Sequence, residues 1–131
     1  MIFPELALTG YPPEDLLLKP GFLSECNAVI GRFAERIDGI CAVVGCVDGM
    51  GPVYNAAAVI SGKTVQCIYR KMVLPNYGVF DEKRYFTPGN RPVSFMLGDC
   101  AVGLNICEDI WVEDGPYRTL FNDHHIDVLL N

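Results

Sequence analysis

The chain has 131 residues and a formal net charge of −6 at pH 7; half of its residues are hydrophobic and a fifth are charged. This composition is typical of a folded domain and excludes an intrinsically disordered chain. The acidic balance argues against a nucleic-acid partner, which favours a basic face, and the longest apolar runs, residues 40–44 and 56–60, are much too short to span a membrane.

The first half of the chain predicts a strand, a helix, a second strand and a hairpin. Residues 1–8 form an apolar, strand-like run that contains one carboxylate, Glu5, and a turn follows at 9–13. From Phe22 to position 37, apolar residues recur at helical spacing, which predicts an amphipathic helix that ends at Gly39. The run 40–47 predicts a buried strand, and the strands 53–60 and 64–69 flank a glycine-containing turn as a hairpin.

The second half predicts a long loop over 71–91, strands over 92–97 and 101–107, a helix over 113–121 and a last strand over 126–130. Fully apolar strands imply a sheet covered on both faces, and the hairpins make this sheet mixed. We therefore predict an α/β layered architecture with about seven strands and two or three helices. One sheet face needs a covering layer from outside these residues.

The cysteines fit neither a zinc site nor a redox motif. The six cysteines include no C-x-x-C pair, and the two histidines are adjacent at 124 and 125, so we expect no metal site. Four of the cysteines lie in apolar runs, where a reduced thiol packs as a small hydrophobe. Reduced thiols and the lack of a basic stretch before the apolar start indicate a cytoplasmic protein without a secretory signal.

Both ends of the chain lie in apolar runs. It opens at residues 1–3 and closes at 126–130, whereas a complete domain usually ends in polar, loosely held residues. We therefore expect residues 1–131 to be a segment of a longer protein.

Three residues break the pattern of their surroundings. Glu5 is a carboxylate in an apolar strand, where burial is costly unless the charge is paired. Lys71 and Cys107 stand where predicted strands give way to loops, a common place for functional side chains. Each alone has an ordinary explanation, solvent contact for the charges and packing for the thiol. Together they provide the base, cation and nucleophile that amide hydrolysis through a covalent intermediate requires.

Three segments resemble the motifs of the nitrilase, or carbon-nitrogen hydrolase, superfamily. Residues 3–6 (FPEL) together with 9–16 (TGYPPEDL) resemble the glutamate motif of that superfamily. Residues 69–86 resemble its lysine motif, and residues 103–111 (GLNICEDIW) resemble its cysteine motif. The order and the separations of Glu5, Lys71 and Cys107 also match. The strings YPPED, LPNYGVFDE and CEDIW are similar to the glutaminase domain of glutamine-dependent NAD synthetases.

The resemblance implies the α-β-β-α sandwich of that superfamily, with residues 1–131 as the central part of a glutamine amidohydrolase domain truncated at both ends. It also implies a synthetase domain further along the parent chain, where ATP and Mg²⁺ are used. We expect no cofactor in this segment. The implied partners are glutamine, that synthetase domain, and further copies in a homo-oligomer packed through the amidase sheets; neither nucleic acid nor membrane is expected.

The resemblance also implies roles for individual residues. Cys107 is the expected nucleophile, Glu5 the group that accepts and returns its proton, and Lys71 the cation that stabilises the oxyanion. Glu82 corresponds to a further glutamate that orients Lys71 or the water, and its alternative is a solvated loop charge. The glutamine pocket is expected to involve Tyr11, Tyr77, Phe80, Glu108 and Trp111. Glu108 would meet the α-ammonium group of the substrate, and ordinary core packing is the alternative for each aromatic.

Two other functions remain open at this point. A free-standing amidase or carbamoylase of the same superfamily would act on another small amide, and a synthetase domain encoded downstream would exclude it. A catalytically inactive scaffold fragment is the second, and we expect these 131 residues by themselves to hydrolyse little or no glutamine. A cysteine-based redox protein is disfavoured, because the chain has neither a C-x-x-C pair nor a Thr-x-x-Cys arrangement that opens a helix.

Overall fold

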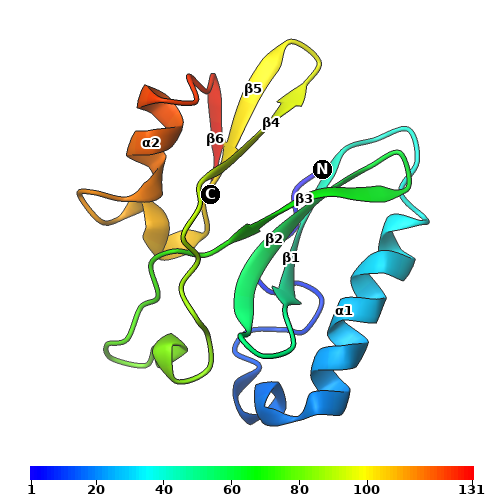
Figure 1. Cartoon of the computed structure of the whole chain (residues 1–131), viewed down its shortest axis with the longest axis vertical. Helices are drawn as coiled ribbons and strands as arrows, with labels where there is room; N and C mark the ends of the chain where they lie inside the picture. The colour runs from blue at the N-terminus through cyan, green and yellow to red at the C-terminus, as the bar shows by residue number, and fades with distance from the viewer.

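The computed structural model describes all residues, 1–131, and contains two three-stranded sheets with a helix against each (Figure 1). The first sheet has the order β1 (Ala42–Asp48), β2 (Tyr54–Ser61), β3 (Thr64–Arg70), and the second has the order β4 (Val93–Leu97), β5 (Cys100–Leu104), β6 (Val128–Leu130). The α-helices are α1 (Pro20–Ala34) and α2 (Pro116–Asn122), and the 3₁₀ turns are η1 (Glu14–Leu18), η2 (Glu82–Arg84) and η3 (Cys107–Ile110). None of the helices combines the length and the hydrophobicity that a membrane-spanning segment needs.

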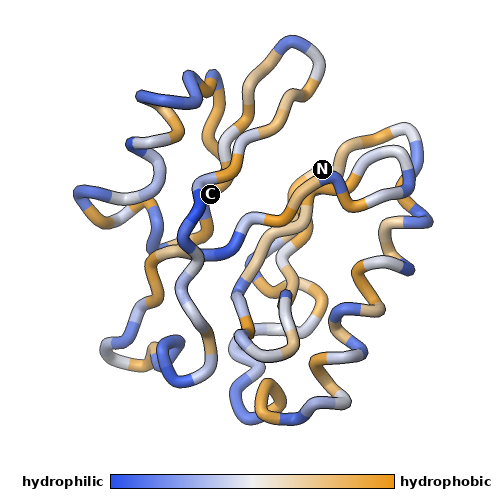
Figure 2. The backbone as a smooth tube through the Cα atoms, in the orientation of Figure 1, coloured by the Kyte–Doolittle hydropathy of each residue, from blue (hydrophilic) through white to orange (hydrophobic).

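The first sheet is antiparallel and buried on both faces. β1 and β2 are apolar over most of their length (Figure 2), whereas β3 at the edge of the sheet alternates with the polar residues Thr64, Gln66 and Arg70. Ile30 and Ala34 of α1 pack on one face, against a cluster that includes Val44. On the opposite face, Val43 and Tyr69 pack with residues of the second half of the chain. The predicted hairpin is therefore confirmed, and so is the predicted burial of β1 and β2, whereas Tyr69 is the one buried residue of β3.

The second sheet is mixed. β4 and β5 are antiparallel, whereas β5 and β6 run parallel and are joined through η3 and α2. A parallel pair needs such a crossover connection. The two-sheet arrangement confirms the predicted α/β class with a mixed sheet, although the strands divide between two sheets instead of forming one.

The structure corrects the predicted strand over residues 1–8. Ile2 forms a single parallel bridge to Val43, and the chain then enters a series of turns through residue 9. The next carbonyl of β1, that of Gly45, accepts from the backbone N–H of Leu8 at 3.2 Å, after the turn, so the ladder does not continue past Phe3. Glu5 consequently lies on a turn, and the next residue, Leu6, has a positive φ of 50°.

Other predicted boundaries shift by a few residues. The strand predicted to reach Cys107 ends at Leu104, and the helix predicted over 113–121 begins at Pro116. Proline favours the first helical position because its missing N–H would be unpaired there in any case. The first predicted helix ends at Ala34, and Gly39 adopts a positive φ of 69° further along the connection to β1.

Gly45 in β1 allows the turn that carries Glu5 to lie directly on the sheet. A Cβ atom at Gly45 would lie 2.2 Å from the carbonyl oxygen of Pro4 and 2.5 Å from the backbone nitrogen of Leu6. The backbone of residues 4–6 therefore occupies the space of a side chain. Any residue other than glycine would move Glu5.

We expect Gly45→Ala to lower the free energy of unfolding of the full-length protein by about 1–3 kcal/mol, because the added methyl group overlaps a packed backbone. Gly31→Ala in α1 is the matched control, since no atom lies within 4 Å of its added Cβ. This control should raise the free energy of unfolding by about 0.5–1 kcal/mol, the usual helix preference of alanine. Urea titration measures both values, and equal stability of the two variants would contradict the close approach at Gly45.

Candidate active site

Lys71 is the most unusual side chain in the structure, because its ammonium group is completely buried. It follows the last residue of β3, and its backbone N–H donates to the carbonyl of Asn55 at 2.8 Å. Its Nζ donates to Oε1 of Glu5 at 2.8 Å and to Oε1 of Glu82 at 3.0 Å, while the side chain is 0% exposed. The two carboxylates compensate a charge that would otherwise be very costly to bury. The ordinary explanation, a solvated lysine at a strand end, is therefore wrong.

Glu5 joins this cluster from the turn above β1. Besides the ammonium of Lys71, its Oε1 accepts a hydrogen bond from Nδ2 of Asn55 at 2.6 Å. Asn55 is a buried amide in the second position of β2. The Glu5 side chain keeps 21% of its surface exposed. It is thus held in place by two donors while one side remains open to the neighbouring cavity.

Glu82 joins the cluster from η2, within the long loop after Lys71. Its residue is only 5% exposed, so the alternative of a solvated loop charge is wrong. Oε1 accepts bonds from both Lys71 and the hydroxyl of Tyr11, the latter at 2.9 Å, whereas Oε2 is buried without a partner. Tyr11, predicted to form the glutamine pocket, is therefore a direct partner of Glu82.

The charges of this cluster shift the pKa values of its members. Burial lowers the pKa of Lys71, but the hydrogen bonds and charges of Glu5 and Glu82 outweigh burial and raise it overall. Lys71 is therefore an ammonium ion at neutral pH. Burial and the neighbouring Glu82 carboxylate raise the pKa of Tyr11, so its hydroxyl remains a hydrogen-bond donor.

Cys107 lies at a sharp change of backbone direction. The preceding residue, Ile106, is extended, and Cys107 opens η3 with a positive φ of 48°. A residue other than glycine rarely adopts this conformation, which costs on the order of 1–3 kcal/mol and is often found at active sites. Burial raises the pKa of the thiol, the carboxylates of Glu5, Glu82 and Glu108 raise it further, and Lys71 lowers it. The thiol is consequently protonated near neutral pH and needs a base to become a nucleophile.

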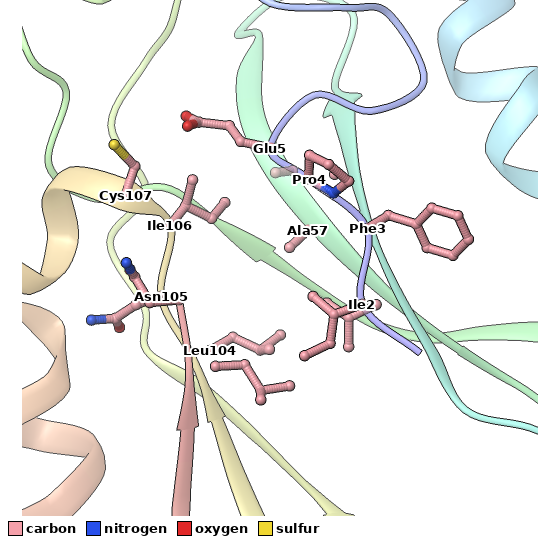
Figure 3. Close-up of a pocket in the computed structure, with 14 residues that line it drawn as sticks. Ile2, Phe3, Pro4, Glu5, Ala57, Leu104, Asn105, Ile106 and Cys107 are labelled. Carbon is pink, nitrogen blue, oxygen red and sulfur yellow. The ribbon is translucent and has the colours of Figure 1, made fainter.

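A cavity of about 360 Å³ connects Cys107 with Glu5. It lies between the two sheets and is lined mostly by apolar side chains. Figure 3 shows the Glu5 carboxylate reaching from the N-terminal segment toward the side of the cavity where the Cys107 sulfur lies. The structure therefore brings Glu5, Lys71 and Cys107 to one place from three segments far apart in the sequence.

The other predicted pocket residues lie further out. The hydroxyl of Tyr77 donates to the Glu108 carboxylate at 2.9 and 3.1 Å, and the Tyr77 and Phe80 rings make an edge contact with centroids 5.6 Å apart. Tyr11, Phe80 and Glu82 line a second hollow beside the cluster. Trp111 is 75% exposed at the end of η3, so its place in a glutamine pocket stays a prediction.

Three polar residues that the sequence reasoning passed over, Asn55, Asn105 and Asp109, are buried at the site, and Asn105 lines the cavity. Asn55 bonds to Glu5, and Asp109 is 0% exposed two residues after Cys107. Asn55 interrupts an apolar strand in the same way as Glu5, so that signal could have identified it. Asp109 stands in a polar stretch, Cys107-Glu108-Asp109, where nothing local distinguishes it from a solvated residue.

The comparison with protein families decides the class of the chain. The carbon-nitrogen hydrolase family model matches residues 1–131, the whole sequence. The chain belongs to the carbon-nitrogen hydrolase family. Glu5, Lys71 and Cys107 lie within the three segments that resemble the family motifs, residues 3–16, 69–86 and 103–111, and their catalytic roles stay a prediction.

Several relatives of this hydrolase chain are larger proteins. It is 43% identical over its whole length to the glutamine-dependent NAD(+) synthetase of Thermotoga maritima, of which it covers 23%, and 50% identical over 87% of its length to that of Xylella fastidiosa strain Temecula1, of which it covers 22%. The chain therefore spans less than a quarter of the length of these curated relatives.

Solved structures agree with this relationship. The glutamine-dependent NAD+ synthetase of Acinetobacter baumannii aligns with 99% of the chain at a TM-score of 0.89 and 40% identity, and the chain covers 25% of that protein. An amidase from Nesterenkonia sp. aligns with 83% of the chain at a TM-score of 0.68 and 25% identity, and the chain covers 42% of it. The fold of this hydrolase chain is thus that of a partial nitrilase-like domain.

We expect Lys71→Met to lower the free energy of unfolding of the full-length protein by about 3–5 kcal/mol, because it leaves Glu5 and Glu82 buried without their cation. The pKa of Lys71 is raised in the folded protein. The loss in free energy of unfolding relative to the wild type is therefore fully present below the ordinary lysine pKa of 10.5, and it declines only as the pH rises beyond that value. Lys63→Met, at an exposed surface ion pair, should change stability by less than about 1 kcal/mol. Chemical denaturation at pH 7 measures both variants, and equal effects would contradict the central role of the buried ammonium.

Proposed function

We propose that this chain carries the catalytic residues of a glutamine amidohydrolase domain in a glutamine-dependent NAD synthetase. The observation that supports it most directly is the buried Lys71 ammonium between Glu5 and Glu82, beside a cavity that Cys107 lines. Lys71 bonds to Glu5, and Glu5 and Cys107 line the same cavity. The set thus contains a nucleophile, a base and a cation, which is what cleavage of a primary amide through a thioester requires. The names of the similar NAD synthetases favour glutamine as the amide.

In the first half of the reaction, the Cys107 sulfur attacks the side-chain amide carbon of glutamine while Glu5 accepts the thiol proton. The raised pKa of the thiol makes this proton transfer necessary. The carbon–nitrogen bond then breaks, and ammonia leaves with the proton that Glu5 returns. The product is a glutamyl thioester on Cys107.

In the second half, Glu5 accepts a proton from a water molecule that attacks the thioester carbon. The carbon–sulfur bond breaks, glutamate leaves, and the sulfur regains its proton. Glu5 thus serves as base in both halves. Its partial exposure toward the cavity suits this role, because the carboxylate must meet the thiol, the departing ammonia and the water in turn.

Lys71 stabilises the oxyanion of both tetrahedral intermediates. An ammonium group has three donors, and Lys71 uses two of them for Glu5 and Glu82, so one remains for the substrate oxygen. The backbone N–H of Glu108, which follows Cys107, is the second donor in this proposal. Glu82 fixes the direction of the ammonium, and the hydroxyl of Tyr11 in turn fixes Glu82.

Glu108 binds the α-ammonium group of glutamine in this proposal. Its carboxylate is held by the hydroxyl of Tyr77, whose ring packs edge-on against Phe80. These residues form a rim that would hold the charged end of the substrate while the amide end enters the cavity. Trp111 is assigned to the outer part of the same rim.

The whole protein would pass the ammonia to a synthetase domain that uses ATP and Mg²⁺ to amidate deamido-NAD+. No group of three or more His, Cys, Asp and Glu side chains in residues 1–131 is placed to hold a metal ion, and ATP and Mg²⁺ belong to the synthetase domain in this proposal. We assign them no step in this chain. A cytoplasmic location and a homo-oligomer packed through the amidase sheets belong to the same proposal.

Glu5→Gln in the full-length protein is expected to abolish NAD+ synthesis driven by glutamine, while free ammonia still supports it, because only amide cleavage needs the carboxylate. Cys107→Ala should show the same pattern. A second measurement treats the protein with a glutamine-mimicking electrophile and locates the label by mass spectrometry. Cys107 should be labelled in the wild type. Glutamine-driven synthesis at the wild-type rate in either variant would refute the proposal, and efficient turnover of another small amide in place of glutamine would favour a free-standing amidase.

Glu108→Gln should raise the KM for glutamine by about 10–100-fold with a smaller effect on kcat, because a charge-assisted bond of about 1.5–3 kcal/mol to the α-ammonium group is lost. Glu113→Gln is the control, since the Glu113 side chain is 90% exposed outside the site. Steady-state kinetics of glutamate release checks both variants. An unchanged KM in Glu108→Gln would place the substrate's ammonium group elsewhere.

A further inference from the structure

The carboxylate of Asp109 receives four hydrogen bonds although it is 0% exposed. Its Oδ2 accepts from the hydroxyl of Tyr69 at 2.7 Å and from the backbone N–H of Ile106 at 2.9 Å. Its Oδ1 accepts from the backbone N–H groups of Met72 at 3.1 Å and Val73 at 2.7 Å. Four acceptor positions thus meet four donors, which is the full capacity of an ionised carboxylate.

These donors come from the two segments that carry the proposed catalytic groups. Met72 and Val73 directly follow Lys71, and Ile106 directly precedes Cys107. The first segment continues β3 of the first sheet, and the second continues β5 of the second sheet, so no strand ladder joins them. The Asp109 carboxylate is therefore a polar bridge between the two sheets at the active site.

A local role explains only part of this arrangement. An acidic residue at the third position of a helical turn often accepts a bond from the backbone N–H that precedes the turn, as Asp109 does from Ile106. Such a cap needs no contact with residues 72 and 73. Burial raises the pKa of Asp109 and outweighs the four donors, which lower it, so keeping this carboxylate inside the protein has a cost. A cap on a short surface turn would not require this burial.

We propose that Asp109 is a positioning residue that sets the distance between the Lys71 ammonium and the Cys107 sulfur. Its chemical consequence rests on the proposed function, in which Lys71 must meet the oxyanion that forms when Cys107 attacks. A displacement of about 1 Å between such groups can lower the rate on the order of 100-fold. Because the carboxylate binds the backbone next to both residues, it controls that distance without touching the substrate.

Asp109→Asn in the full-length protein tests this directly. The variant keeps the size of the side chain but turns an NH₂ donor toward donors that need an acceptor. Tyr69→Phe is the matched control, because it removes the hydroxyl and leaves the carboxylate with its three backbone donors. Both variants are normalised to the number of Cys107 thiols that a glutamine-mimicking electrophile can titrate, so that any unfolded fraction drops out.

Turnover of glutamine per titrated site should fall by about 100-fold or more in Asp109→Asn, with KM changed by less than about threefold. Tyr69→Phe should keep its turnover per site within about threefold of the wild type, even if it melts at a lower temperature. A second readout is the pH dependence of Cys107 alkylation by iodoacetamide, followed at the Cys107 peptide. Its midpoint should move to higher pH in Asp109→Asn, because a more distant Lys71 lowers the pKa of the thiol less, and should stay in place in Tyr69→Phe.

Unchanged turnover per site in Asp109→Asn, with only fewer titratable sites, would overturn the proposal and leave Asp109 a purely structural residue. An equal loss in Tyr69→Phe would also overturn it. If Asp109→Asn yields no folded protein, Asp109→Ser, which retains one acceptor, is judged by the same two readouts. If the wild type does not hydrolyse glutamine, the proposed function fails, but the alkylation midpoint still decides the role of Asp109.

Discussion

The buried ammonium of Lys71 is the constraint on which the site depends. A charge removed from water needs compensation close by, and here Glu5 and Glu82 provide it at 2.8 and 3.0 Å. Glu5 comes from a turn before the first helix, and Glu82 comes from a loop after the first sheet. Both segments must therefore be held against the end of β3 for the chain to fold with this lysine inside.

Several features of the fold serve that requirement. Gly45 lets the turn at residues 4–6 lie against β1, which places the Glu5 carboxylate above Lys71. The hydroxyl of Tyr11 and the amide of Asn55 then bind the two carboxylates from either side. The cluster is thus a connected set of hydrogen bonds, in which each member limits the freedom of the next.

The same electrostatics shapes the chemistry that we propose. Burial raises the pKa of the Cys107 thiol, and the surrounding charge, more negative than positive, adds to this rise. A preformed thiolate is therefore not the resting state, and the neighbouring Glu5 becomes necessary as a base. Asp109 adds a mechanical link between the two sheets, so that a nucleophile from one and a cation from the other keep a constant separation.

The sequence by itself determined the elements and the residues that carry the family motifs. Two strand-like runs around a glycine-containing turn located the hairpin of β2 and β3, and helical spacing located α1, because these signals depend on neighbours within a few residues. The motifs around Glu5, Lys71 and Cys107 indicated the carbon-nitrogen hydrolase family, which the family match shows. These features are local, so they can be read without knowing how the chain folds back on itself.

Only the tertiary structure decided which polar residues are buried and what they contact. Lys71 and Glu82 could be solvated charges as far as their neighbours in sequence reveal, and Asp109 has donors more than thirty residues away. The turn at Glu5 was mistaken for strand, because an apolar run fits either conformation and only the contact with β1 shows that the pairing stops after the bridge at Ile2. Burial and long-range hydrogen bonds depend on which segments pack against each other, and a local sequence pattern does not contain that information.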